Sequence, residues 1–118
     1  MSEYFISRPD DNEWSLDIEA FARKLQERWP NIRLRSYPAQ AEWDIKEEEY
    51  VIVGELYFSP GPVVCIDGEL KGCAEFALWY RQQIPADQLI WFYDDELSNH
   101  VVLDNETTIE QIVNAFED

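Results

Sequence analysis

Two cysteines and one histidine are the residues of this chain that could form a nucleophile and its base. Cys65 and Cys73 are eight positions apart, which is not the Cys-x-x-Cys spacing of redox and zinc sites. Cys73 is expected to begin a helix, where a thiol pKa is lowered, and His100 would serve as its base with Asp94 or Asp95 as the orienting group. Free cysteines are usually packing residues, so the sequence favours two unpaired, buried or half-buried thiols over this catalytic pair.

The chain lacks the short motifs that usually accompany catalysis or cofactor binding. It contains no Gly-x-Ser-x-Gly, no glycine-rich phosphate loop and no His-Glu-x-x-His. The acids at 94–96 with His100 mix oxygen and nitrogen ligands, but their spacing does not match a calcium-binding EF-hand loop. We therefore predict no metal and no cofactor, and the sequence favours a protein that is not an enzyme.

Acidic residues dominate the charge of the chain. Its formal net charge is −16, from 25 Asp and Glu against 9 Lys and Arg. Residues 1–38 are nearly balanced, whereas residues 39–118 contain only Lys46, Lys71 and Arg81 as bases. Such a charge argues against unaided binding to nucleic acid or to anionic lipid, because both need cations on the protein. The excess is either a solvated surface that maintains solubility or a docking face for a basic protein partner.

Two acidic runs and one tryptophan are the candidate docking residues. The run at 94–96 is the first choice, because it joins two expected strands and concentrates three acids. The run at 47–49 is the second. Trp14 precedes a helix in a polar stretch, where it is either a hydrophobic staple or an exposed interface anchor. The predicted partner-binding residues are thus Asp94, Asp95, Glu96, Glu47, Glu48, Glu49 and Trp14.

Hydrophobic periodicity places these residues on secondary structure. We expect strands near 3–8, 32–35, 42–45, 50–58, 63–66, 89–93 and 100–103, and helices over 16–29, 74–83 and 109–116. Ser15 is the expected N-cap of the first helix, and Thr107 with Glu110 fits a capping box for the last. Strands and helices in this order are typical of an α+β fold. We predict a single α+β domain over residues 1–118, with a mostly antiparallel sheet of about five to seven strands and two to three helices packed on it.

The alternating segments also predict a register. If 36–41 forms a loop, Arg33 lies opposite Asp44 and Arg35 opposite Glu42 on the wet face, while Trp43 faces the core. A set of four tryptophans falls mostly on predicted core faces: Trp29, Trp43, Trp79 and Trp91.

The function that best fits these features is a small acidic cytoplasmic protein-binding module. It would be an inhibitor or immunity-type protein that docks on a basic partner, by analogy of charge with proteins that neutralise nucleases. The cytoplasmic location is expected because no apolar run approaches the roughly twenty residues of a membrane span and no signal peptide is recognisable. The alternatives are a small enzyme that depends on Cys and His, and a structural homo-oligomeric subunit that pairs through sheet edges. The sequence does not determine the oligomeric state.

Overall fold

The computed structural model describes residues 2–7, 17–58, 62–84, 88–94 and 99–116. They confirm the predicted α+β fold. The strands are β1 (Ser2–Ser7), β2 (Arg33–Tyr37), β3 (Gln40–Lys46), β4 (Val51–Phe58), β5 (Pro62–Gly68), β6 (Ile90–Asp94) and β7 (His100–Leu103). The helices are α1 (Ile18–Arg28), α2 (Leu70–Gln82) and α3 (Ile109–Phe116).

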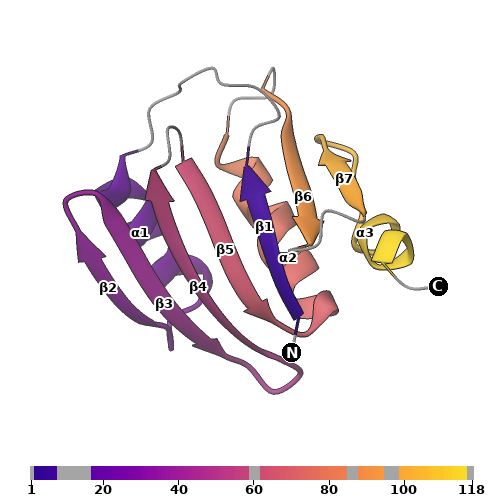
Figure 1. The fold of residues 1–118 in the computed structure, drawn as a ribbon. Helices are drawn as coiled ribbons and strands as arrows, with labels where there is room; N and C mark the ends of the chain where they lie inside the picture. The colour runs from indigo at the N-terminus through magenta and orange to yellow at the C-terminus, as the bar shows by residue number, and fades with distance from the viewer. Residues whose placement is uncertain (1, 8–16, 59–61, 85–87, 95–98, 117–118) are drawn as a thin grey trace.

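The seven strands form one sheet in which every pairing is antiparallel. Their spatial order is β2-β3-β4-β5-β1-β6-β7, so the first strand of the chain lies in the interior of the sheet between β5 and β6. Helices α1 and α2 pack on one face of this sheet, and α3 packs beside β7 and α2. No helix covers the other face among the described residues (Figure 1). We call this uncovered surface the open face.

Side chains alternate between the two faces, as expected for a sheet that is covered on one side. In β5, Val64 and Ile66 point to the helices and are fully buried, whereas Val63, Cys65 and Asp67 point to the open face and are half-buried. Within the described residues no helix is long and apolar enough to cross a membrane, since the longest, α2, has 13 residues.

The predicted register of the first hairpin is confirmed. Arg33 pairs with Asp44 and Arg35 with Glu42, and Trp43 is 2% exposed on the covered face. An ion pair joins Arg35 Nη2 to Glu42 Oε2 at 3.5 Å. Because the Arg35 side chain is largely exposed, this pair is worth at most ~1 kcal/mol. Burial of Trp43, rather than the charge pair, therefore determines the register.

The helix boundaries differ from the predicted ones. Asp17, not Ser15, is the N-cap of α1, and its Oδ1 accepts hydrogen bonds from the backbone N–H groups of Glu19 and Ala20 at 3.0 and 3.3 Å. The capping box of α3 is shifted by one residue. It is formed by Thr108 and Gln111, whose side-chain oxygens each accept from the other's backbone N–H.

Helix α2 begins four residues before its predicted start, because a tertiary contact stabilises its first turn. Gly72 lies so close to the Tyr50 ring that an added Cβ would be 2.7 Å from Tyr50 Cγ. Tyr50 is itself held by the Trp29 indole, whose Nε1–H donates to Tyr50 Oη at 3.2 Å. Sequence periodicity does not contain these contacts.

Aromatic rings form the centre of the core between the helices and the sheet. Phe76 of α2 stacks on Trp29 with a centroid distance of 5.6 Å and on Trp43 with a centroid distance of 5.3 Å. Trp43 in turn packs against the backbone of Gly54 on the neighbouring strand, where a Cβ would lie 2.6 Å from the indole. A residue without a side chain is therefore required at position 54.

The close approach of Trp43 to Gly54 leads to a stability prediction. Gly54→Ala should lower the free energy of unfolding by about 1–3 kcal/mol, because the added methyl group overpacks the core. Urea denaturation followed by tryptophan fluorescence measures the change. Val53→Ala, at the neighbouring position that is 44% exposed, is the matched control and should change stability much less. Equal stability of Gly54→Ala and the wild type would contradict the packing described here.

Candidate functional site: the open face of the sheet

The open face is built from the outward-pointing residues of all seven strands. Their order across the sheet follows from the strand register. One row across the sheet is Arg33–Asp44–Val53–Asp67–Glu3, and the next is Arg35–Glu42–Glu55–Cys65–Phe5–Tyr93–His100. Beyond it lie the pairs Tyr37–Gln40 on β2 and β3 and Tyr57–Val63 on β4 and β5, and the row Ser7–Trp91–Val102 on β1, β6 and β7. Each row therefore brings together residues that are far apart in the sequence.

Five half-buried carboxylates gather at the middle of this face. We call them the acidic cluster: Glu3, Glu42, Asp44, Glu55 and Asp67. Two pairs within it stand directly opposite one another on neighbouring strands, Glu42 with Glu55 and Glu3 with Asp67. Like charges in such positions destabilise a sheet. Among the described residues, the ion pair with Arg35 relieves this repulsion at Glu42, and no other ion pair reaches the cluster.

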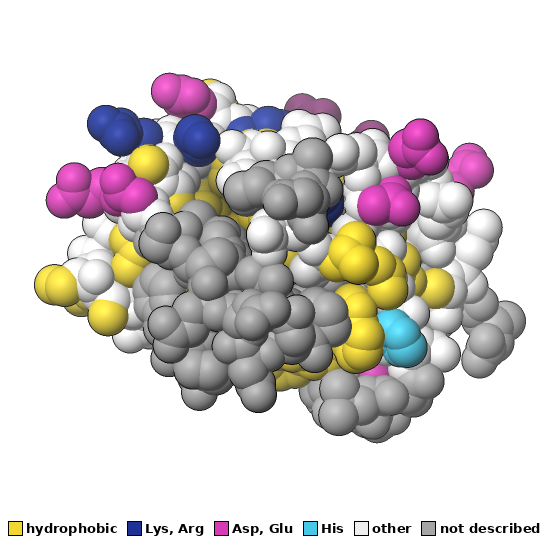
Figure 2. All heavy atoms as spheres, turned by 90° about the horizontal axis from the view of Figure 1, so that it is seen from above, with side chains coloured by type: hydrophobic (Ala, Val, Ile, Leu, Met, Phe, Trp, Pro, Cys, Tyr) yellow, Lys and Arg dark blue, Asp and Glu magenta, His cyan; other side chains and the backbone are white. Residues whose placement is uncertain are grey.

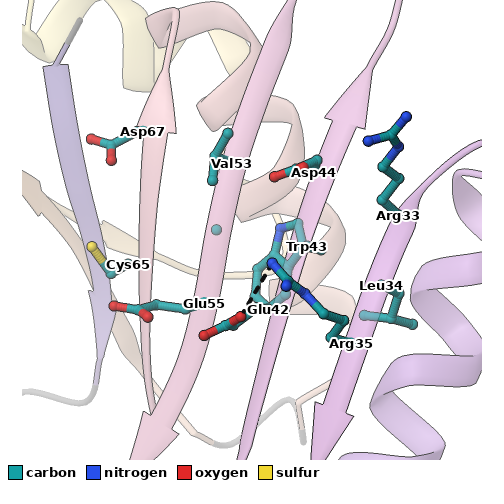
Figure 3. Close-up of a pocket in the computed structure, with 11 residues that line it drawn as sticks. Arg33, Leu34, Arg35, Glu42, Trp43, Asp44, Val53, Glu55, Cys65 and Asp67 are labelled. Carbon is teal, nitrogen blue, oxygen red and sulfur yellow. Dashed lines mark ion pairs between the residues drawn. The ribbon is translucent and has the colours of Figure 1, made fainter.

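A depression of about 720 Å³ lies over β2 to β5 within this cluster. Figure 3 shows Glu55, Cys65 and Asp67 on one side of it and Arg33 and Arg35 on the other. Val53 contributes an exposed apolar side chain to the depression. It lies between Asp44 and Asp67, which are its partners on the two neighbouring strands. The depression thus has an apolar floor at Val53 and a rim of carboxylates, with Arg33 and Arg35 along one edge.

Aromatic side chains occupy the adjoining part of the open face. Phe5 stacks on Tyr93 with a centroid distance of 5.6 Å, and Trp91 stacks on His100 at 4.6 Å. Figure 2 shows the histidine, in cyan, beside hydrophobic side chains. We call these four residues with Tyr57 the aromatic strip. Trp91 was expected on the core face, which is wrong: β6 is covered on one side only, and Ile90 and Phe92 take the inward positions.

Tyr57 connects the aromatic strip with the acidic cluster, because its hydroxyl group lies near Glu55. Burial is the main cause that raises the pKa of the Tyr57 hydroxyl, and the nearby Cys65 and Glu55 raise it further. Tyr93 is held in place from the neighbouring strand by a hydrogen bond of 2.9 Å between its hydroxyl and Ser7 Oγ. The two parts of the face therefore form one continuous surface.

Neither cysteine lies in an environment that activates a thiol. Both are free thiols, as predicted. Cys73 is a buried residue within α2, not its first residue, and burial raises its pKa to about 12. Cys65 donates a hydrogen bond to Glu3 Oε1 at 3.4 Å, and burial followed by this contact raises its pKa to about 12. His100 is three strands away from Cys65, which is roughly 14 Å at the usual strand spacing.

The predicted docking residues that the structure describes lie away from the acidic cluster. Glu47, Glu48 and Glu49 are exposed in the connection between β3 and β4, where Glu49 forms an ion pair of 3.6 Å with Lys71. Asp94 ends β6 opposite Tyr4, which assigns it to the covered face of the sheet. The remaining three, Asp95, Glu96 and Trp14, lie outside the described residues.

The acidic cluster was not identified from the sequence. Part of its local signal was present, since Glu42 and Asp44 alternate with apolar residues in β3. What was missing was the strand order, which brings Glu3 beside Asp67. Within the described residues no group of three or more His, Cys, Asp or Glu side chains is arranged to hold a metal ion.

Comparisons with known proteins identify no relative. No family model, no curated protein and no solved structure matches the chain. The geometry and charge of the open face are therefore the basis for a functional proposal.

The environment of the thiols leads to a reactivity prediction. Iodoacetamide at pH 8 should alkylate native Cys65 and Cys73 far more slowly than the same residues in urea, because a pKa of about 12 leaves almost no thiolate. A raised thiol pKa contributes stability that is present below the ordinary value near 9 and is lost as the pH rises toward 12. Peptide mass mapping over time measures both rates. A cysteine that reacts as fast in the native protein as in urea would contradict this assignment and restore the enzyme alternative.

Proposed function

We propose that this protein is a binding module that docks on a basic protein partner through the open face of its sheet. The observation that supports the proposal best is the presence of two pairs of opposed carboxylates, Glu42 with Glu55 and Glu3 with Asp67. These contacts oppose folding, so an explanation from stability alone does not account for them. Local choices that conflict with the fold are typical of functional sites.

Solubility alone accounts less well for this arrangement. Acids that serve solubility are equally effective on exposed helix positions, such as Glu27 on α1, where no carboxylate opposes them across a strand. On the open face the carboxylates are half-buried and lie around an apolar floor. A basic surface that covers them would neutralise the repulsion and exclude water from the pairs it forms, which strengthens each pair.

The alternative functions have less support. Two copies that pack open face against open face would bring two acidic clusters together, which raises the repulsion; these charges do not bear on pairing through the edge strands β2 and β7. An enzyme based on Cys and His would need a thiol close to the imidazole, but Cys65 is three strands from His100 and Cys73 is buried in α2 on the covered side of the sheet. A basic partner, in contrast, would be attracted from a distance and would associate faster at low salt.

Neutralising one member of each opposed pair tests the proposal. The double variant Glu55→Gln with Asp67→Asn should raise the free energy of unfolding by ~0.2–1 kcal/mol for each pair relieved. It should also slow association with the partner and flatten the salt dependence of the rate, because it removes charges within the screening length of about 8 Å. The partner is obtained by affinity capture from the source cell at low and high salt, and surface plasmon resonance measures the rates.

The matched control removes the same amount of charge away from the open face. Glu27→Gln with Glu106→Gln alters two exposed carboxylates on α1 and on the turn before α3, and it should retain wild-type association. A third variant that neutralises Glu47, Glu48 and Glu49 tests the loop predicted from the sequence. If the open-face variant and the control associate at the same rate, docking through the open face is wrong. If no basic protein is retained even at low salt, the charge serves solubility.

A further inference from the structure

Strand β2 is an edge of the sheet and has β3 as its neighbour on one side. Along its outer side, Figure 1 shows no other described element. The residues of β2 are exposed apart from Leu34, which is half-buried. An exposed edge strand presents unpaired backbone N–H and C=O groups, and these are a template for a further strand. The outer side of β2 therefore has room for an extended chain.

The backbone groups available at this edge follow from the register of the first hairpin. A two-residue turn joins β2 to β3, so the pair next to it, Tyr37 with Gln40, is a hydrogen-bonded pair. Such pairs alternate with non-hydrogen-bonded pairs along an antiparallel ladder. The backbone groups of Leu34 and Ser36 therefore point away from the sheet. Among the described residues, no backbone–backbone hydrogen bond outside the strand ladder involves them.

The side chains at this edge are basic, in contrast to the chain as a whole. Residues 18–37, from the start of α1 to the end of β2, contain five bases and two acids, whereas the whole chain has a net charge of −16. Arg33 and Arg35 lie on the same face of β2, about 7 Å apart along the strand. Arg33 makes no ion pair with a described residue, and Arg35 is paired only with Glu42, on the inner side of β2. The edge therefore favours a strand with carboxylates at alternate positions.

Strand β3 already has this pattern on the inner side of β2. Its acids, Glu42 and Asp44, stand opposite the two arginines. Trp43, which lies between these acids, points to the covered face. A guanidinium group has five N–H donors, so each arginine has donors for a carboxylate on either side of β2. An added strand with the same alternation would thus repeat on the outer side the pairing that β3 makes on the inner side.

The other face of the edge limits which residues fit between the acids. A depression of about 760 Å³ lies between the end of β2 and the start of α1, where Ile18, Ser36 and Tyr37 contribute to its lining. Asp17 and Glu19 line it as well. These two carboxylates would repel a third one, so the intervening residues of an added strand should be apolar or carry a hydroxyl group.

A second copy of β2 fits this edge less well than an acidic strand. In an antiparallel pairing centred on Leu34, Arg33 would face Arg35 of the second copy. A pairing centred on Arg35 would place the two copies of this residue opposite each other. Both arrangements oppose like charges across strands. A pairing centred on Ser36 would bring Pro38, which has no N–H group, opposite Leu34. Charge therefore selects an acidic strand from another protein.

We propose that the outer edge of β2 binds an extended acidic segment of a partner protein as an eighth strand of the sheet. Carboxylates at alternate positions of this segment pair with Arg33 and Arg35. The residues between them exchange backbone hydrogen bonds with Leu34 and Ser36, as in other cases of strand addition. This surface and the charge of its ligand differ from those of the proposed function, and neither proposal depends on the other.

The blocked peptide Thr-Glu-Val-Glu-Thr is the probe for this inference. Titration into ¹⁵N-labelled protein should shift the NMR amide signals of β2 more than those of the other strands. Physiological salt is used, because it screens the remote acids of the protein beyond about 8 Å. N-methylation of the central valine removes a hydrogen bond to β2 and should weaken binding about twofold to tenfold. N-methylation of the second glutamate, whose N–H group points away from β2, should leave the affinity unchanged.

Protein variants test the contribution of charge. Arg33→Gln with Arg35→Gln should weaken binding about twofold to thirtyfold, the range of two cross-strand charge pairs. The matched control, Lys24→Gln with Lys71→Gln, removes the same charge from exposed positions of α1 and α2 and should retain wild-type affinity. Ser36→Pro removes an outward N–H group without changing the charge, and an edge strand tolerates proline at such a position. It should also weaken binding. Urea denaturation confirms that each variant is folded.

The outcomes distinguish strand addition from other ways of using this edge. Equal binding of the valine-methylated and unmethylated peptides would overturn strand addition. Equal binding of Thr-Lys-Val-Lys-Thr would overturn selection by charge, and the absence of shifts in β2 at millimolar peptide would overturn the inference as a whole. A molecular mass that rises with protein concentration in the wild type but not in Ser36→Pro would assign the edge to a second copy. None of these results alters the effect expected of Glu55→Gln with Asp67→Asn, so docking on the open face is tested separately.

Discussion

The stack of Trp29, Phe76 and Trp43 is the interaction on which the rest of the structure depends. It joins the end of α1, the middle of α2 and strand β3 in one layer of aromatic rings. The stack requires Gly54 on β4, because the Trp43 indole occupies the space that a side chain would take. Both larger helices are thereby held on the same face of the sheet, and no helix covers the open face within the described residues.

A sheet covered on one side needs different residues on its two faces, and this chain uses the second face in an unusual way. Polar outward positions are expected wherever a sheet meets water. Here they hold carboxylates that oppose one another across strands, next to an aromatic strip. Neither feature improves folding, since opposed like charges repel and half-exposed rings leave apolar surface in water. Both features are suited to a surface that is covered by a partner.

The cysteines illustrate how burial determines chemistry. A thiol at the exposed start of a helix is activated by the positive end of the helix dipole, whereas a thiol inside the core remains protonated. Because α2 starts earlier than its periodicity indicates, Cys73 is in the second situation. Cys65 also remains protonated on the open face, because it is half-buried and donates its hydrogen bond to Glu3.

The sequence alone determined the features that depend on neighbouring residues. Alternation and helical periodicity predicted the elements, and the burial of Trp43 set the pairing of Arg33 with Asp44 through a short connection. Tertiary structure decided where β1 lies, and with it the meeting of Glu3 with Asp67 and of Phe5 with Tyr93. Local periodicity contains no information on which distant strands pair, because that choice depends on how α2 and the aromatic stack close the core. The open face was therefore visible in the sequence only as separate alternating acids and aromatic residues.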